Sequence, residues 1–289
     1  MALKIWLNEG LVEESEAKVS VFDHGLLYGD GVFEGIRVYN RAIFEMEAHM
    51  DRLYESAKAI RLVIPMDKTA LTDAVRQTVQ ANGVENGYIR LVVTRGVGTL
   101  GLNPFVCKKG QIIIIASNIQ LYPEELYENG LKVISAVTMR NHPLAIPPQV
   151  KSLNYLNNIM AKIEALDNNV LEAIMYNHQG YVAEATGDNV FIVRRGIIFT
   201  PPVSSGSLQG ITRNVVIRLA REAGHEVVEK DLTRFDLYNC DEFFLTGTAA
   251  EVIGIVNIDG RIVGDGKPGL MTKMLRTRFY EVASGIQSS

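Results

Sequence analysis

Lys151 is separated from other formal charges by a long stretch of sequence. With His142 taken as neutral, Lys151 is the only charged side chain between Arg140 and Lys162. An ammonium group held away from water and counter-ions loses solvation, so burial favours the neutral amine, which can act as a nucleophile or a base. The alternative is a lysine that ends a buried strand and extends its ammonium into water. This feature alone leaves both interpretations open.

Two turns of small residues could bind a phosphate. Residues 206–212 read GSLQGIT and lead into a predicted helix, presenting unpaired backbone N–H groups at the positive end of its dipole. Residues 246–249 read TGTA and form a second such turn after a predicted strand. Each turn alone is more often an ordinary cap or loop. Arg52, off the apolar stripe of a predicted helix, is either an exposed arginine or a phosphate anchor.

Glu184 is a candidate partner for a protonated ring nitrogen. It ends a predicted strand, and the small residues at 185–187 would let a planar ligand approach closely. The simpler alternative is a surface acid at a turn. None of the 5 histidines forms a pair with metal-ligand spacing, so no metal site is predicted.

Length and composition are those of a globular enzyme. A chain of 289 residues that is 47% hydrophobic can form about two domains. The net charge of −4, with scattered Lys and Arg, argues against a nucleic-acid partner. Cys107 and Cys240 belong to no C-x-x-C pattern, and apolar runs are too short for a signal peptide or a membrane span. We therefore expect a soluble protein in a reducing cytoplasm.

Strands and helices alternate in the first part of the chain. The elements predicted there are strands within residues 4–45 and at 88–94 and 111–117, and helices at 46–60 and 68–82. Asp67 and Gly83 are the expected caps of the second helix. The apolar run at residues 112–115 is typical of a strand covered on both faces.

The second part follows a similar pattern. The predicted elements are a strand at 131–139, a helix at 154–166, short strands within 172–200, a helix at 211–224, a strand at 242–245, a hairpin turn at 259–260 and a helix after residue 268. Hairpins are too frequent for a regular parallel βαβ wind. We predict two mixed α/β domains: a small one at 1–118, a connector at 119–130 and a large one at 131–289.

Four segments resemble the branched-chain amino acid aminotransferases. Residues 22–37 read FDHGLLYGDGVFEGIR, residues 151–157 KSLNYLN, residues 210–213 GITR and residues 247–251 GTAAE. They occur in the family's order and span nearly the whole chain. The resemblance implies a two-domain fold type IV enzyme that depends on pyridoxal 5'-phosphate.

The resemblance also implies which residues bind the cofactor. Lys151 matches the lysine that forms the internal aldimine and later carries the proton between the substrate Cα and the cofactor. Glu184 matches the acid facing the pyridine nitrogen. Tyr155 matches a tyrosine near the phenolic oxygen, although it follows the lysine one residue sooner than in some members. The rest of the predicted cofactor set is Arg52, Leu208, Gly210, Ile211, Thr212, Gly247 and Thr248.

The implied substrate site combines apolar and polar groups. Tyr88 and the backbone at Thr248 and Ala249 resemble the α-carboxylate site. The side-chain pocket corresponds to Phe33, Gly35, Leu102 and Tyr122, and its polar edge to Tyr28, Arg37 and Arg90. This mixture suits a pocket that alternates between a leucine-like substrate and glutamate. In the family the equivalents of Tyr28 and Leu102 come from a neighbouring subunit, which implies at least a homodimer.

The predicted reaction is transamination of leucine, isoleucine and valine with 2-oxoglutarate, giving the 2-oxo acid and L-glutamate. D-amino acid aminotransferases carry an Arg-x-His motif where residues 98–103 read GTLGLN, and aminodeoxychorismate lyases tend to have Phe-Glu-Thr where residues 33–35 read Phe-Glu-Gly. These two activities and (R)-amine transamination are the alternatives on the same fold. Residues 187–189 read Gly-Asp-Asn instead of the usual Gly-Glu-Asn, a conservative departure.

Two other classes of protein fit less well. A non-catalytic pyridoxal phosphate carrier needs no electron sink and hence not both Lys151 and Glu184. A class I aldolase usually has a regular βα barrel, which the hairpin-rich pattern does not match.

Overall fold

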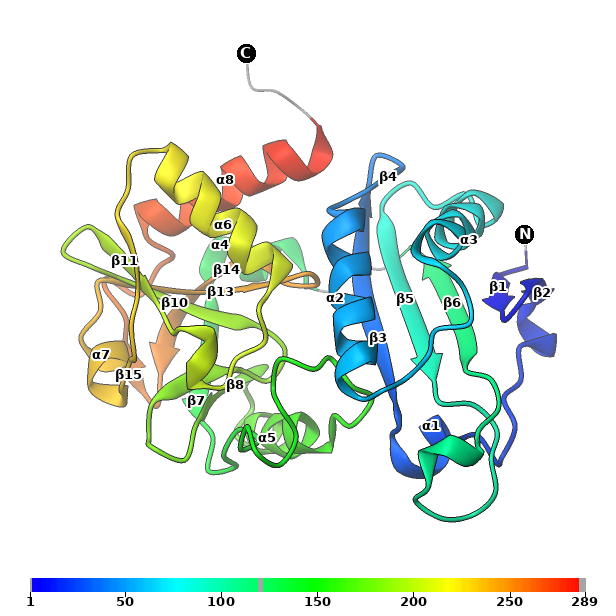
Figure 1. Ribbon diagram of the computed structural model, residues 1–289. Coiled ribbons are helices and arrows are strands. Elements are labelled where there is room, and N and C mark those ends of the chain that lie inside the picture. The colour runs from blue at the N-terminus through cyan, green and yellow to red at the C-terminus, as the bar shows by residue number, and fades with distance from the viewer. Residues whose placement is uncertain (1, 119–121, 286–289) are drawn as a thin grey trace. The chain divides into compact units, whose positions relative to one another are not determined.

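The computed structural model describes residues 2–118 and 122–285 (Figure 1). The chain divides into two compact units, the first made of Met1–Gln120 with Val150–Asn154 and the second of Leu121–Gln149 with Tyr155–Ser289. The short segment that contains Lys151 therefore belongs to the first unit, although its neighbours on both sides along the chain belong to the second.

The first unit is built on one antiparallel sheet. Its strands are β1 (Lys4–Leu7), β2 (Gly10–Glu13), β3 (Gly31–Tyr39), β4 (Ala42–Ile43), β5 (Gly87–Thr94) and β6 (Gln111–Ser117). They form a 6-stranded sheet in the order β2-β1-β6-β5-β3-β4. The helices are α1 (His24–Tyr28), α2 (Met46–Ala59) and α3 (Lys68–Ala81), with 3-10 turns η1 (Glu14–Glu16) and η2 (Pro104–Val106).

Helices α2 and α3 cover one face of this sheet and form its core (Figure 1). The predicted apolar stripe on α2 is confirmed, because Met50, Leu53 and Ala57 are buried against the strands. The predicted N-cap of α3 is also confirmed: the Asp67 side chain accepts a hydrogen bond from the Ala70 N–H at 2.8 Å.

Strand β6 differs from its prediction. A strand covered on both faces was expected at residues 112–115, but only Ile112 and Ile114 are fully buried, whereas Ile115 is 36% exposed. The alternation arises because neighbouring side chains of a strand point to opposite faces, and helices cover one face of this antiparallel sheet.

The second unit has a larger, mixed sheet. Its strands are β7 (Leu131–Ser135), β8 (Glu172–Tyr176), β9 (Val182–Ala185), β10 (Asn189–Arg194), β11 (Ile197–Thr200), β12 (Val227–Glu229), β13 (Glu242–Gly247), β14 (Glu251–Ile258) and β15 (Arg261–Ile262). The order is β12-β11-β10-β13-β14-β7-β8-β9, and β15 pairs with β14. The pairs β11/β12, β14/β7 and β7/β8 are parallel and the others antiparallel, which confirms the predicted mixed α/β class.

The helices of the second unit are α4 (Glu124–Asn129), α5 (Leu156–Asp167), α6 (Ile211–Glu222), α7 (Arg234–Tyr238) and α8 (Leu270–Ser284), with the 3-10 turn η3 (Val203–Ser205). Helix α4 lies in the stretch predicted as a connector, of which residues 119–121 lie outside the described residues. Among the described residues no helix is both long and apolar enough to cross a membrane.

Strand β7 is shorter than predicted. It ends at Ser135 instead of reaching residue 139. The Ala136 N–H still donates to the Ile174 carbonyl on β8 at 2.8 Å, but the N–H groups of Val137 and Thr138 donate to the Glu164 carboxylate on α5 at 2.6 and 2.9 Å. These two groups thus have a side-chain partner in place of a neighbouring strand.

Candidate active site

Backbone hydrogen bonds fix Lys151 beside β3 and α2. The Phe33 N–H donates to the Lys151 carbonyl at 3.0 Å, and the Lys151 N–H donates to the Ser56 hydroxyl oxygen at 3.1 Å. The Lys151 Nζ lies 4.5 Å from the centroid of the Phe33 ring, within the range of a cation–π contact. The side chain is half-buried, a position between the two interpretations that the sequence left open.

Five predicted substrate residues lie on neighbouring strands of the first sheet. Phe33, Gly35 and Arg37 alternate along β3, and the register pairs Gly35 with Arg90 and Arg37 with Tyr88 on β5. A Cβ atom on Gly35 would clash with the Tyr88 hydroxyl, so glycine leaves room for the phenol. The Arg90 guanidinium lies 4.6 Å from the Phe33 ring centroid and 5.4 Å from that of Tyr88. The face opposite the α2 and α3 core therefore combines aromatic rings with a guanidinium.

Tyr28 anchors the loop that carries Leu102. The Gly101 N–H donates to the Tyr28 hydroxyl oxygen at 2.9 Å, and His24 Nε2 lies 2.9 Å from the Thr99 carbonyl oxygen. The Leu102 side chain is 83% exposed. The two residues that the resemblance assigns to a neighbouring subunit's site thus lie in one connected, exposed region of this chain.

Arg52 is held by a buried carboxylate. Its Nε donates to Glu34 Oε1 at 2.8 Å and its Nη2 to Glu34 Oε2 at 2.7 Å, while His49 Nδ1 lies 2.7 Å from Glu34 Oε2. Burial alone would raise the pKa of Glu34, but the charge and hydrogen bonds of Arg52, followed by His49, lower it to about 2. Burial lowers the pKa of His49 and is only partly offset by Glu34. The carboxylate is therefore charged, and it is bound on the side of β3 that faces α2.

Glu184 is buried on β9 and accepts two hydrogen bonds. Arg140 Nε donates to Oε1 at 2.7 Å, and the Leu208 N–H donates to Oε2 at 2.9 Å. Glu184 is 5% exposed and Arg140 7%, and Arg140 Nη1 also lies 3.4 Å from Asn157 Oδ1 and 3.3 Å from Asn158 Oδ1. Glu184 is therefore an ordered interior carboxylate and not a surface acid.

The N-terminus of α6 suits an anion. Gly210 is the N-cap residue, and no side chain caps the helix there. The first N–H groups of the helix, at Ile211 and Thr212, therefore lie at the positive end of the helix dipole without a capping side chain. A Cβ on Gly210 would clash with Asn189 Oδ1. The amide group of Asn189 donates to the Leu208 carbonyl at 2.9 Å and so fixes the loop that leads into α6.

Two hydroxyl groups, one in the loop before α6 and one at the end of β13, lack a partner among the described residues. Ser207 Oγ and Thr246 Oγ1 are buried and form no hydrogen bond within the described part of the chain. Buried hydroxyls normally have a partner. After Thr246, Gly247 packs so closely on Asp188 that a Cβ would clash with Oδ1, and the half-buried Thr248 and Ala249 continue the turn. The two turns thus offer donors to a ligand rich in oxygen atoms.

Two predicted tyrosines also belong to the second unit. Tyr122 packs on the core and makes an edge-to-face contact with Tyr127, with ring centroids 6.3 Å apart. Burial, and then the carboxylates of Asp188 and Glu172, raise the pKa of Tyr122. Tyr155 is half-buried and directly precedes α5.

The predicted residues fall into two groups, one in each unit. The first unit contains Tyr28, Phe33, Gly35, Arg37, Arg52, Tyr88, Arg90, Leu102 and Lys151, and the second contains Tyr122, Tyr155, Glu184, Leu208, Gly210, Ile211, Thr212, Gly247, Thr248 and Ala249. Within each unit, backbone pairing and side-chain hydrogen bonds hold many of these residues in place.

Sequence reasoning missed the residues that hold Arg52 and Glu184. His49 and Arg52 are three positions apart on one helix, a spacing that puts them on the same face and could have indicated a shared partner. No comparable signal marks Arg140, because its partner is 44 residues away in the sequence.

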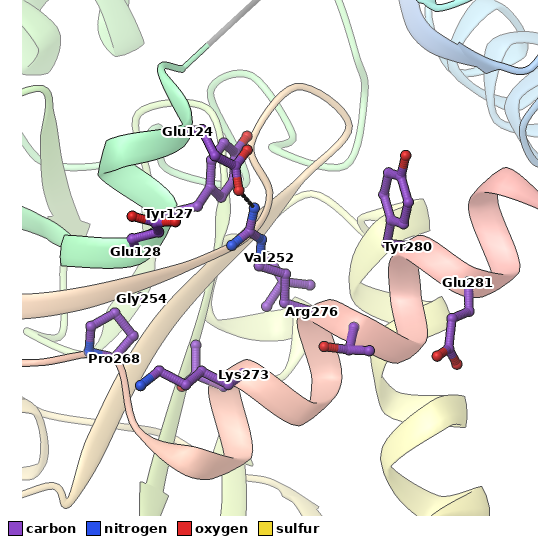
Figure 2. Close-up of a pocket in the computed structure, with 12 residues that line it drawn as sticks. Glu124, Tyr127, Glu128, Val252, Gly254, Pro268, Lys273, Arg276, Tyr280 and Glu281 are labelled. Atoms are coloured by element: carbon purple, nitrogen blue, oxygen red, sulfur yellow. Dashed lines mark hydrogen bonds and ion pairs between the residues drawn. The ribbon is translucent and has the colours of Figure 1, made fainter. Parts of the chain in front are cut away.

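A cavity of about 850 Å³ lies within the second unit, between α4, β14 and α8 (Figure 2). Arg276 pairs there with Glu124, and its guanidinium lies 4.4 Å from the Tyr127 ring centroid. The described residues that line this cavity include none of the predicted site residues. It is therefore separate from the groups described above.

Known proteins resemble this chain along its whole length. A model of the family "Amino-transferase class IV" matches residues 31–258. A protein of Methanocaldococcus jannaschii named putative branched-chain-amino-acid aminotransferase is 50% identical over 281 residues, covering 97% of this chain and 96% of the relative. The branched-chain-amino-acid aminotransferase of Escherichia coli is 37% identical over 287 residues, covering 97% and 93%.

Solved structures of branched-chain amino acid aminotransferases have a fold similar to that of this chain. The branched-chain amino acid aminotransferase of T.th., solved with pyridoxamine 5'-phosphate, has a TM-score of 0.96 at 38% identity, covering 99% of this chain and 96% of that one. The same enzyme complexed with N-(5'-phosphopyridoxyl)-L-glutamate has a TM-score of 0.95. These findings confirm the predicted fold type and the predicted cofactor, pyridoxal 5'-phosphate. The chain belongs to the class IV aminotransferases.

Proposed function

We propose that this protein is a branched-chain-amino-acid aminotransferase that transfers the amino group of leucine, isoleucine or valine to 2-oxoglutarate. The observation that carries the proposal is the surface of β3 and β5, where Arg90 lies over the rings of Phe33 and Tyr88. The rings suit an apolar side chain, and the guanidinium suits the second carboxylate of glutamate. The names of the relatives support the same substrates, and one neighbour has been solved with a phosphopyridoxyl glutamate and with 4-methylvaleric acid.

The residues of both units fit pyridoxal phosphate. The phosphate would be held by Arg52, by the N–H groups that begin α6 and by Thr248. The buried Ser207 and Thr246 hydroxyls, which lack protein partners in the described residues, support a ligand rich in oxygen atoms at these turns. When bound, the cofactor supplies an electron sink for the negative charge that develops at the substrate Cα as its proton leaves.

Lys151 and Glu184 have the two central roles in this proposal. Lys151 would hold the cofactor covalently and would carry the proton from the substrate Cα, and its backbone position is fixed by β3 and α2. Glu184 keeps a proton on the pyridine nitrogen. Its carboxylate is held in one orientation by Arg140 and the Leu208 N–H, so it can face a ring without first reorganising.

The remaining predicted residues bind the substrate. The backbone at Thr248 and Ala249, with Tyr88, holds the α-carboxylate, and Tyr122 contributes to the side-chain pocket. Tyr28 and Leu102 complete the pocket of a second copy in a homodimer. Two observations support this role: Leu102 is exposed, and the Tyr28 hydroxyl oxygen accepts a hydrogen bond from Gly101, in the loop that carries Leu102.

A substrate panel tests the proposal. Purified protein with pyridoxal phosphate and 2-oxoglutarate is given L- and D-amino acids and a primary amine, and the glutamate formed is measured. We expect glutamate from L-leucine, L-isoleucine and L-valine. Turnover restricted to D-alanine, D-glutamate or the amine would show that one of the alternative activities is the correct one.

A further inference from the structure

We propose that Glu34 is a positioning residue that sets the affinity of the protein for the phosphorylated form of its cofactor, by holding the Arg52 guanidinium in place. The inference rests on the proposed function, in which Arg52 binds the phosphate. Glu34 does not itself bind the cofactor in this proposal.

The contact between Glu34 and Arg52 restricts the guanidinium to one plane. Arg52 uses Nε and Nη2 for two bonds, of 2.8 and 2.7 Å, to the two oxygens of the carboxylate. This is the bidentate arrangement that a planar guanidinium forms with a carboxylate. Two of the five guanidinium N–H groups are engaged in it. The direction of the others follows from the position of Glu34.

Glu34 is itself fixed by its surroundings. It lies within β3, paired with Leu91 on β5, and its side chain is fully buried. His49 Nδ1 lies 2.7 Å from the same oxygen that accepts from Arg52 Nη2. The carboxylate of Glu34 therefore has a position fixed by the sheet of the first unit, and through its hydrogen bonds it fixes the position of Arg52 on α2.

Charge and orientation have opposite effects on a phosphate. The negative charge of Glu34 cancels that of Arg52 and so weakens the attraction for an anion. The orientation strengthens binding, because an arginine already held in place loses less side-chain freedom when the ligand arrives. We expect orientation to dominate. Without Glu34, the guanidinium, only 11% exposed in its side chain, would turn toward other acceptors or water.

The sign of the effect can be measured with Glu34→Gln. Dissociation constants of the apo-protein are determined by absorbance titration with pyridoxal phosphate and with pyridoxal, which lacks the phosphate. We expect the Kd for pyridoxal phosphate to rise about tenfold or more, and that for pyridoxal to change by less than about twofold. Unchanged or tighter binding of pyridoxal phosphate, or equal weakening of both ligands, would overturn the proposal.

Two further variants separate this inference from the assignment of Arg52. Arg52→Met should abolish the preference for the phosphorylated ligand. If Arg52→Met keeps the preference for pyridoxal phosphate over pyridoxal, the proposed phosphate role of Arg52 is wrong. If Arg52→Met loses this preference but Glu34→Gln keeps it, only the proposed role of Glu34 is refuted. Asp51→Asn is the matched control. It removes one negative charge, as Glu34→Gln does, but from the exposed residue next to Arg52 on α2, where Asp51 pairs with Lys68. It should leave the Kd for pyridoxal phosphate and the Kd for pyridoxal unchanged.

A third variant keeps the test decisive if Glu34→Gln does not fold. His49→Gln leaves the Arg52 bonds in place but removes the imidazole that contacts the carboxylate. It should raise the Kd for pyridoxal phosphate above that of the wild type, again with little change for pyridoxal. A ratio of the two constants equal to that of the wild type would contradict the proposal.

Discussion

Arg140 and Glu184 form a buried ion pair in the second unit, with 2.7 Å between Nε and Oε1 and side-chain exposures of 6% and 7%. Glu184 is the residue proposed to meet the ring nitrogen, and Arg140 fixes one of its oxygens. The carboxylate therefore has a defined direction that its own strand does not provide. Its second oxygen is fixed by the Leu208 N–H, on the loop that leads into α6.

Breaking this pair should cost substantial stability. Arg140→Met leaves the Glu184 charge buried with a single donor, and we expect the free energy of unfolding to fall by about 3–5 kcal/mol. Chemical denaturation measures the change. Arg218→Met, which removes the arginine of an exposed pair with Glu222 on α6, is the control and should cost less than about 1 kcal/mol. Similar losses in both variants would show that burial of the first pair is unimportant.

Replacement of Lys151 tests the covalent anchor. Lys151→Ala should lower turnover of leucine by at least about 10³-fold while the cofactor still binds noncovalently, because the proton carrier is lost. Borohydride reduction of the wild-type holoenzyme, followed by peptide mass spectrometry, should place a pyridoxyl label on residue 151. A label on another lysine, or near-native turnover of the variant, would remove the basis of the mechanism.

Glu184→Gln tests the nitrogen partner. The single amide oxygen can still accept from Arg140, the uncharged side chain keeps the size of the carboxylate, and only the bond from the Leu208 N–H is lost, so we expect the fold to persist. It cannot keep a proton on the pyridine nitrogen, and kcat for leucine should fall about 10²-fold or more. Single-turnover kinetics with leucine measure the affected step. An unchanged rate would mean that the nitrogen partner lies elsewhere.

Arg90→Met tests how one pocket accepts two kinds of substrate. The guanidinium is proposed to bind the second carboxylate of glutamate and 2-oxoglutarate, and a hydrogen bond to a charged group contributes about 1.5–3 kcal/mol. We expect KM for 2-oxoglutarate to rise by about tenfold to a hundredfold and KM for leucine to change little. Initial rates over both substrates give the two constants. A parallel rise in both would indicate general damage to the pocket.

Acid should destabilise the first unit through Glu34. Its pKa is about 2 in the folded protein against 4.5 ordinarily. The unfolded chain therefore takes up a proton first, and the stabilisation, complete above pH 4.5, is lost as the pH falls toward 2. The pKa of His49 is also lowered from its ordinary value of 6.5, so His49 adds to the loss of stability as the pH falls below 6.5. Unfolding measured at pH 7 and pH 4 should show a smaller difference for His49→Gln than for the wild type. An equal difference would exclude His49 as a source of the acid sensitivity.

Local signals predicted the elements better than the contacts between them. Asp67 identified the start of α3 because an N-cap acts within one turn of its own helix. The predicted end of β7 was wrong because the carboxylate that accepts from the Val137 and Thr138 N–H groups belongs to Glu164, far along the chain on α5. The coverage of Ile115 was wrong because an apolar run does not reveal how many faces of its sheet are packed.

The candidate site shows the same division. Lys151 and Glu184 could be proposed from the sequence because their neighbours resemble a known family. Arg140, which orients Glu184, and Glu34, which orients Arg52, could not, since each pair is made only when distant strands and helices come together.

The membership of Val150–Asn154 in the first unit has a consequence for how this protein can be divided. The Gly31 carbonyl accepts from the Leu153 N–H, and the Phe33 N–H donates to the Lys151 carbonyl. A fragment that stops before the connector would leave both groups of β3 without these partners and would also lack the amine of Lys151. A cut at the connector would therefore separate the proposed catalytic lysine from β3, the strand to which its segment is hydrogen-bonded and which lies much earlier in the chain.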